Sequence, residues 1–129
     1  MPHATIEYSA NLEQRLDIAA LCTATLEAAS STGALELAAT RVRAVRCDHY
    51  AIADRHRDNA FVDVSLRIGR GRSEEAKAAA GKALWEALRA QCAPLFETPY
   101  FALSLELREI DPVLSWKENG IKPRLRAAR

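Results

Sequence analysis

One order of segments occurs twice along this sequence, and it constrains the fold more than any other feature. An alternating apolar segment is followed by a stretch with apolar residues at helical spacing, and then by a second extended segment. Such an order predicts two consecutive β-α-β units. The predicted strands cover residues 3–8, 41–53, 61–68 and 102–108, and the two predicted helices begin near residues 18 and 73.

The first unit takes up roughly residues 1–57. Its opening strand alternates apolar and polar side chains and begins almost at the chain terminus. A helix is predicted over 18–29, with Asp17 as its N-cap and Gly33 as a left-handed residue after its end. The second strand, 41–53, has a weaker alternation because arginines and aspartates interrupt it.

The second unit takes up roughly residues 58–110, and both of its strands alternate without a break. Ser73 is placed to start a long helix, and Pro94 to end it. Gly81 lies inside this helix, where glycine costs about 1 kcal/mol relative to alanine, which indicates close packing against a sheet. The tail, 111–129, contains two prolines and five basic residues and has no clear periodicity.

The two units predict one α+β domain over residues 1–129, with two helices on one face of a four-stranded sheet. No helix is left to cover the other face of that sheet. We therefore expect a second copy of the chain to cover it, and we expect the tail, 111–129, to reach a neighbouring subunit.

Composition excludes several classes of protein. The net charge is only +1, which argues against a general nucleic-acid binder. No apolar run approaches the ~20 residues that cross a bilayer, and no secretory signal pattern opens the chain, so a cytoplasmic protein is expected. The three cysteines have no ligand-like spacing with each other or with the histidines, and we predict no metal site.

The charge is unevenly distributed along the chain. Residues 1–40 carry five acidic side chains and one basic side chain, whereas residues 41–72 carry eight arginines, four aspartates and no lysine. Arginine favours fixed, bidentate recognition of carboxylate or phosphate groups. The middle of the chain is therefore a candidate for binding an acidic small molecule, although a solvated basic face would have the same composition.

Several motifs are spread over nearly the whole chain: Pro2-His3, Ile6-Glu7-Tyr8-Ser9 with Asn11, Phe61-Val62, Leu66-Arg67-Ile68-Gly69, Gly71-Arg72-Ser73, Ala102-Leu103-Ser104, Asp111-Pro112 and Trp116-Lys117-Glu118-Asn119. Together they resemble one family, the 5-carboxymethyl-2-hydroxymuconate isomerases of the tautomerase superfamily. The resemblance implies a homotrimer of double β-α-β subunits that needs neither cofactor nor metal. It also implies isomerisation of an unsaturated 2-hydroxy/2-oxo di- or tricarboxylate in homoprotocatechuate breakdown.

The resemblance assigns roles to three residues. Pro2 matches the family's N-terminal proline, which moves the proton through its ring nitrogen once Met1 is removed. Arg41 and Arg72 match arginines that surround the substrate's carboxylates and carbonyl oxygen. Arg43 competes with Arg41 because both lie on the same side of an alternating strand, and only the family match favours Arg41. Arg72 could instead be a solvent-facing residue of a glycine-flanked turn.

There is a chemical reason for placing arginines beside a terminal amine. An amine serves as a general base at pH 7 only if its pKa lies near neutrality. An apolar pocket and nearby guanidinium groups both lower the pKa of an amine. Two alternatives remain open from the sequence: hydration or dehalogenation at the same proline, and a non-catalytic trimer that binds an acidic metabolite. Retention of Met1 would favour the second, because an acylated proline nitrogen has no basic lone pair.

Overall fold

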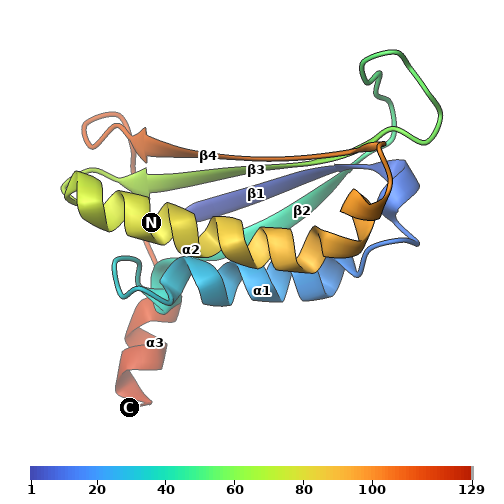
Figure 1. Cartoon of the computed structure of the whole chain (residues 1–129). Helices are drawn as coiled ribbons and strands as arrows, with labels where there is room; N and C mark the ends of the chain where they lie inside the picture. The colour runs from blue at the N-terminus through green and yellow to red at the C-terminus, as the bar shows by residue number, and fades with distance from the viewer. Residues whose placement is uncertain (129) are drawn as a thin grey trace.

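The computed structural model describes residues 1–128. Four strands form one mixed sheet, and the helices α1 and α2 lie side by side on one of its faces (Figure 1). The strands are β1 (His3–Ser9), β2 (Arg41–Cys47), β3 (Ala60–Gly69) and β4 (Phe101–Ile110). The helices are α1 (Ile18–Ser30), α2 (Glu74–Cys92) and α3 (Ile121–Ala127), with short 3₁₀ turns at Ala10–Leu12, Leu37–Ala39 and Ala93–Glu97.

The sheet order, β2-β1-β3-β4, follows from the two β-α-β units. β1 and β2 pair in parallel across α1, and β3 and β4 pair in parallel across α2. The two units join through the antiparallel pair β1–β3 at the centre of the sheet. The predicted α+β architecture is therefore confirmed. β1, which begins next to the chain terminus, is an interior strand of the sheet.

The core lies between the sheet and the two long helices. Alternate residues of the central strands are buried there, as the period of two requires. The helix stripe over Ala80, Leu84 and Leu88 packs onto them. On the strands the largest fully buried side chains are Ile6, Val62, Val64, Leu66 and Ile68.

Both predicted helix starts are confirmed by their caps. The Asp17 carboxylate accepts a hydrogen bond from the Ala20 N–H at 2.9 Å, and the Ser73 hydroxyl accepts one from the Ala76 N–H at 3.1 Å. α2 ends at Cys92, before Pro94, as predicted. Gly33 has a φ of +80°, the left-handed conformation expected after α1.

Two expectations need correction. β2 ends at Cys47, not near Ala53, because its partner β1 ends at Ser9 and offers no further backbone to pair with. The following loop, 48–59, is closed by Asn59, whose side chain donates to the Ile52 carbonyl and the Asp54 carboxylate. The tail is not irregular throughout either, because it contains α3.

α3 packs against the Leu37–Ala39 turn of its own chain, instead of reaching only toward a neighbour. Glu36 anchors it through ion pairs with Lys122 at 2.9 Å and Arg126 at 3.1 Å. The Asn119 carboxamide oxygen accepts hydrogen bonds from the first free N–H groups of the helix. A third helix was absent from the sequence prediction because most of its fixing contacts come from residues far away in the chain.

The open face of the sheet is polar and its charges are segregated. Arg41, His3, Arg67 and Arg108 occupy one row across the four strands, at the end where β1 begins. Four residues further along β1, on the same face, Glu7 pairs with Asp63 of β3. The positive end of this face is therefore the end that holds Pro2.

Candidate active site

Pro2 is buried at the start of the central strand β1. Its carbonyl oxygen accepts a hydrogen bond from the Arg41 N–H at 3.0 Å, which ties the chain terminus to the start of β2. A residue held on an interior strand does not fray as most chain ends do. The structure therefore gives the nitrogen of Pro2 a fixed position.

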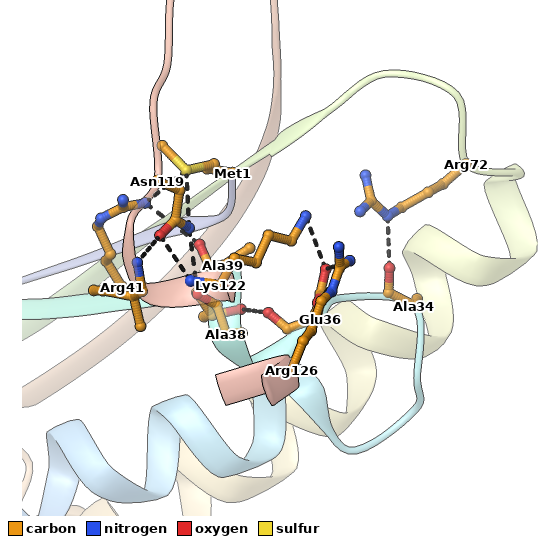
Figure 2. Close-up of polar contacts among 12 residues, drawn as sticks. Met1, Ala34, Glu36, Ala38, Ala39, Arg41, Arg72, Asn119, Lys122 and Arg126 are labelled. Atoms are coloured by element: carbon orange, nitrogen blue, oxygen red, sulfur yellow. Dashed lines mark hydrogen bonds and ion pairs between the residues drawn. The ribbon is translucent and has the colours of Figure 1, made fainter. Parts of the chain in front are cut away.

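The Met1 side chain lies between two polar groups from distant parts of the chain (Figure 2). Arg41 Nη1 donates to the Met1 sulfur at 3.2 Å and to the Ala39 carbonyl at 3.4 Å. Asn119 Nδ2 approaches the same sulfur at 3.4 Å and the Ala38 carbonyl at 3.3 Å. The structure thus brings Arg41 to the chain terminus.

The surroundings of the terminal amine lower its pKa below the ordinary value for an α-amino group. The largest cause is burial, followed by the charge and the hydrogen bond of Lys117. The charges of Arg72 and Arg41 act in the same direction. The amino group concerned is that of Met1, which precedes Pro2, and each of these causes disfavours its ammonium form.

Arg72 is half-buried and partly committed to the backbone. Its Nε donates to the Ala34 carbonyl at 2.7 Å, and its Nη1 donates to the Gly69 carbonyl at 2.9 Å. It therefore joins the loop before β2 to the end of β3, as Figure 2 shows for Ala34. The Nη2 group has no intramolecular hydrogen bond within residues 1–128, so Arg72 is neither wholly structural nor wholly free.

Arg43 and Arg41 have different environments, although both lie on the open face. Arg43 is exposed, and its Nη1 lies 3.4 Å from Nδ1 of His3. Burial lowers the pKa of His3, and the charges of Arg67, Arg43 and Arg41 lower it further. Arg43 therefore contacts the residue next to Pro2, whereas Arg41 contacts the terminus itself.

A cavity of about 410 Å³ opens beside Met1. Its walls come from the start of β1, the ends of β3 and β4, and the tail before α3. Charged side chains lining it are Arg67, Arg70 and Lys117, with His3 beside them; apolar walls are Ile110, Pro112, Leu114 and Trp116.

A larger groove of about 800 Å³ runs between α2 and β4, away from the terminus. There the charge of Lys77 is paired with Glu74 at 2.7 Å and Glu109 at 3.3 Å. The smaller cavity is the better candidate for an acidic ligand because its cations have no carboxylate within 4.0 Å among residues 1–128.

Three residues at this site were not assigned a role from sequence: Lys117, Asn119 and Arg67. The first two lie in the tail, whose lack of periodicity hid the fact that it folds back over the terminus. The sequence signal for Lys117 and Asn119 was the Trp116-Lys117-Glu118-Asn119 motif, which contributes to the family resemblance but was assigned no functional role. Arg67 could have been found by asking which arginine shares a row with His3.

Within residues 1–128, no cluster of three or more histidine, cysteine, aspartate or glutamate side chains is arranged to hold a metal ion. None of the helices in that range has the length and apolar character needed to cross a membrane.

Comparison with known proteins matches this arrangement to one family. The family model described as 5-carboxymethyl-2-hydroxymuconate isomerase matches residues 2–125, which is nearly the entire chain. The chain belongs to the 5-carboxymethyl-2-hydroxymuconate isomerase family. As a member of that family, it is an isomerase.

Individual members of the 5-carboxymethyl-2-hydroxymuconate isomerase family are similar over the full length. The 5-carboxymethyl-2-hydroxymuconate Δ-isomerase of Escherichia coli is 36% identical over 121 residues, which span 94% of this chain and 96% of that protein. The crystal structure of a 5-carboxymethyl-2-hydroxymuconate isomerase from Deinococcus radiodurans R1 is 35% identical, with a TM-score of 0.90 over 97% of this chain and 94% of that one.

A more distant structure shares the fold of the tautomerase superfamily. It is a symmetric trimer of wild-type fused 4-OT, 13% identical, with a TM-score of 0.62 over 90% of this chain and 93% of that one. At this identity the likeness concerns the fold alone.

Proposed function

We propose that this isomerase moves a proton on 5-carboxymethyl-2-hydroxymuconate or a closely related unsaturated 2-hydroxy polycarboxylate, with Pro2 as the base after removal of Met1. The observation that carries the proposal is the fixed, buried position of Pro2, whose carbonyl accepts a hydrogen bond from the Arg41 N–H at 3.0 Å. The same surroundings lower the pKa of the Met1 amino group, first by burial and then through Lys117, Arg72 and Arg41. A cytoplasmic site of action fits the three free cysteines.

The reaction needs no atom from outside the substrate. The neutral amine of Pro2 accepts the proton of the 2-hydroxyl group, and the O–H electron pair becomes part of the new C=O bond. The carbon–carbon double bonds shift along the chain, and the resulting ammonium group returns a proton to carbon, in a 1,3- or 1,5-transfer overall. A single nitrogen placed beside the dienol is enough for both halves of this step.

Removal of Met1 would do more than expose the amine. It would also free Arg41 Nη1 and Asn119 Nδ2 from the sulfur that they contact at 3.2 and 3.4 Å. We assign Arg41, with its freed donor, and Arg72, with its remaining Nη2, to the substrate's carboxylates and carbonyl oxygen. A guanidinium group suits both, because it presents parallel donors to planar oxygen pairs.

We propose that the working form is a homotrimer with its sheets facing inward. The open face of the sheet and the tail segment before α3 support this assembly. Val113 and Trp116 in that segment are 78% and 86% exposed, which is unusual for large apolar side chains without a partner. The symmetric trimer of fused 4-OT has the same fold.

The test combines intact mass with an ultraviolet assay on 5-carboxymethyl-2-hydroxymuconate. Protein whose mass lacks Met1 should isomerise the dienol without added metal or cofactor. A matched variant with an uncleavable residue before Pro2 should fold and assemble equally well and show no activity. Full activity of the blocked variant would exclude the amine as base, and a monomer near 14 kDa in light scattering would exclude the trimer.

A further inference from the structure

The cations around the cavity beside Met1 differ from their neighbours in having no counter-charge. Arg108, in the same row as Arg67, pairs with Glu106, and Lys122, in the same tail as Lys117, pairs with Glu36. Neither Arg67 nor Lys117 has a carboxylate within 4.0 Å among residues 1–128.

Lys117 is held in place by the segments on both sides of it. Before it, the Asp111 carboxylate accepts hydrogen bonds from the N–H groups of Val113 and Leu114 at 2.8 and 3.2 Å. After it, Asn119 is tied to the Ala38 carbonyl and to the start of α3. The tail therefore presents Lys117 to the cavity from a fixed backbone.

Lys117 also meets another positive group at close range. After burial, its charge contributes to lowering the pKa of the Met1 amino group, and the charge of Arg67 contributes likewise at His3. Like charges brought together without an anion are unfavourable. An anionic group bound between Lys117 and Arg67, which both line the cavity, would supply the missing counter-charge and relieve this repulsion.

Arg70 is the less suitable of the cavity's cations. The pKa of Asp111 is lowered first by the N–H groups of Val113 and Leu114 and then by the charge of Arg70, so the field of Arg70 already acts on a carboxylate. Among residues 1–128, neither Lys117 nor Arg67 forms an ion pair with a carboxylate.

We infer that Lys117 and Arg67 form a carboxylate subsite for the substrate group that a simple dicarboxylate dienol lacks, the carboxymethyl carboxylate. This rests on the proposed function, in which Arg41 and Arg72 serve the other acidic groups. The subsite gives the enzyme its preference for a tricarboxylate. Lys117 and Arg67 are specificity-determining residues, because they bind a group that takes no part in the proton transfer.

The kinetic test compares kcat/KM for 5-carboxymethyl-2-hydroxymuconate with kcat/KM for 2-hydroxymuconate, which lacks the third carboxylate. Lys117→Gln and Arg67→Gln should each lower the ratio of the two values about 10- to 100-fold, the usual worth of a hydrogen bond to a charged group. The ratio cancels any change in the amine's pKa, because the same amine acts on both substrates. Lys117→Arg should restore part of the ratio, and Lys82→Gln on α2 is the matched control.

A binding test does not depend on turnover. Propane-1,2,3-tricarboxylate should bind more tightly than glutarate, which has one carboxylate fewer, when titrated calorimetrically in a buffer free of phosphate. Lys117→Gln should abolish that difference, while Lys82→Gln should retain it.

The outcomes separate the two proposals. An equal loss on both substrates, or an unchanged ratio, would overturn the subsite while leaving the isomerase intact. A wild-type protein that isomerises neither dienol, yet loses its preference for the tricarboxylate in Lys117→Gln, would overturn the proposed function and support the subsite. No preference for the tricarboxylate in the wild-type protein would overturn the subsite in either case.

Discussion

Nη1 of Arg41 lies 3.2 Å from the sulfur of Met1, so the first side chain of the sequence occupies one donor of this guanidinium group. Asn119 approaches the same sulfur from the tail. Removing one residue would therefore create a basic nitrogen and release two donors at the same place. Processing of the terminus and completion of the proposed site are, in this arrangement, a single event.

The first prediction concerns the pH dependence of the reaction. In protein that lacks Met1, kcat/KM should rise with pH through one ionisation, as Pro2 loses its proton. Arg41→Gln should move this ionisation to higher pH, because removing a nearby cation stabilises the ammonium form. Arg15→Gln, at the opposite end of the sheet, is the control with a matched loss of charge. A midpoint unchanged in Arg41→Gln would contradict the proposed electrostatics.

The second prediction concerns the ring nitrogen itself. Pro2→Ala should fold normally, because the Pro2 carbonyl that binds Arg41 N–H is kept. It should lose about 10²- to 10⁴-fold in kcat, the usual contribution of a positioned general base. Circular dichroism checks that the variant folds, and kcat measured on the same sample checks the loss of activity. Wild-type kcat in this variant would show that the ring is not required.

The third prediction separates the arginines. Arg72→Ala should lower kcat/KM and also lower the free energy of unfolding, because the carbonyls of Ala34 and Gly69 lose their donors. Arg41→Ala should lower kcat/KM with a smaller effect on stability. Arg43→Ala, the exposed control on the same strand, should change kcat/KM less than either. Equal, mild effects at all three positions would mean that general positive potential explains the cluster.

Much of the fold could be predicted because the deciding interactions are local. The caps at Asp17 and Ser73 use N–H groups three residues away, and strand alternation is a property of the strand itself. The predicted end of β2 was wrong because the true end depends on the length of β1. The two strands pair only as far as Ser9 and Cys47. Local sequence does not contain that limit.

In the candidate site too, some residues could be assigned from the sequence and others could not. Pro2, Arg41 and Arg72 carried a family match, and the structure brings Arg41 and Arg72 within electrostatic reach of the terminus. Lys117 had no such assignment, because its place depends on a tail that folds back through Asn119 and Ala38, which are far apart in sequence. Only a three-dimensional structure reveals that contact.

The fourth prediction concerns the anchoring of α3. Lys122 and Arg126 lower the pKa of the Glu36 carboxyl group. A carboxyl whose folded-state pKa is lowered stabilises the folded form above its unfolded pKa, near 4.5, and loses that effect as the pH falls through the folded value. Glu36→Gln should therefore speed hydrogen exchange in residues 121–127 at pH 7, with little further change on acidification. Glu86→Gln on α2 is the control, and equal protection in both variants would contradict the anchor.

The last prediction uses two glycines that would both accept a methyl group without a clash. A Cβ built on Gly81 meets its nearest neighbour, Leu107 Cδ1, at 4.0 Å, and one built on Gly33 meets nothing within 4 Å. The close packing expected at Gly81 is therefore absent within the subunit, and Gly81→Ala should raise the free energy of unfolding by about 0.5–1 kcal/mol through helix propensity.

Gly33→Ala should lower the free energy of unfolding by about 1 kcal/mol, because the φ of +80° at this position strains any residue with a Cβ. Urea titrations at one protein concentration measure both variants under the same conditions. Since the two substitutions add the same group to open space, the difference in sign isolates the backbone. Destabilisation by Gly81→Ala would instead indicate that another subunit fills the groove between α2 and β4.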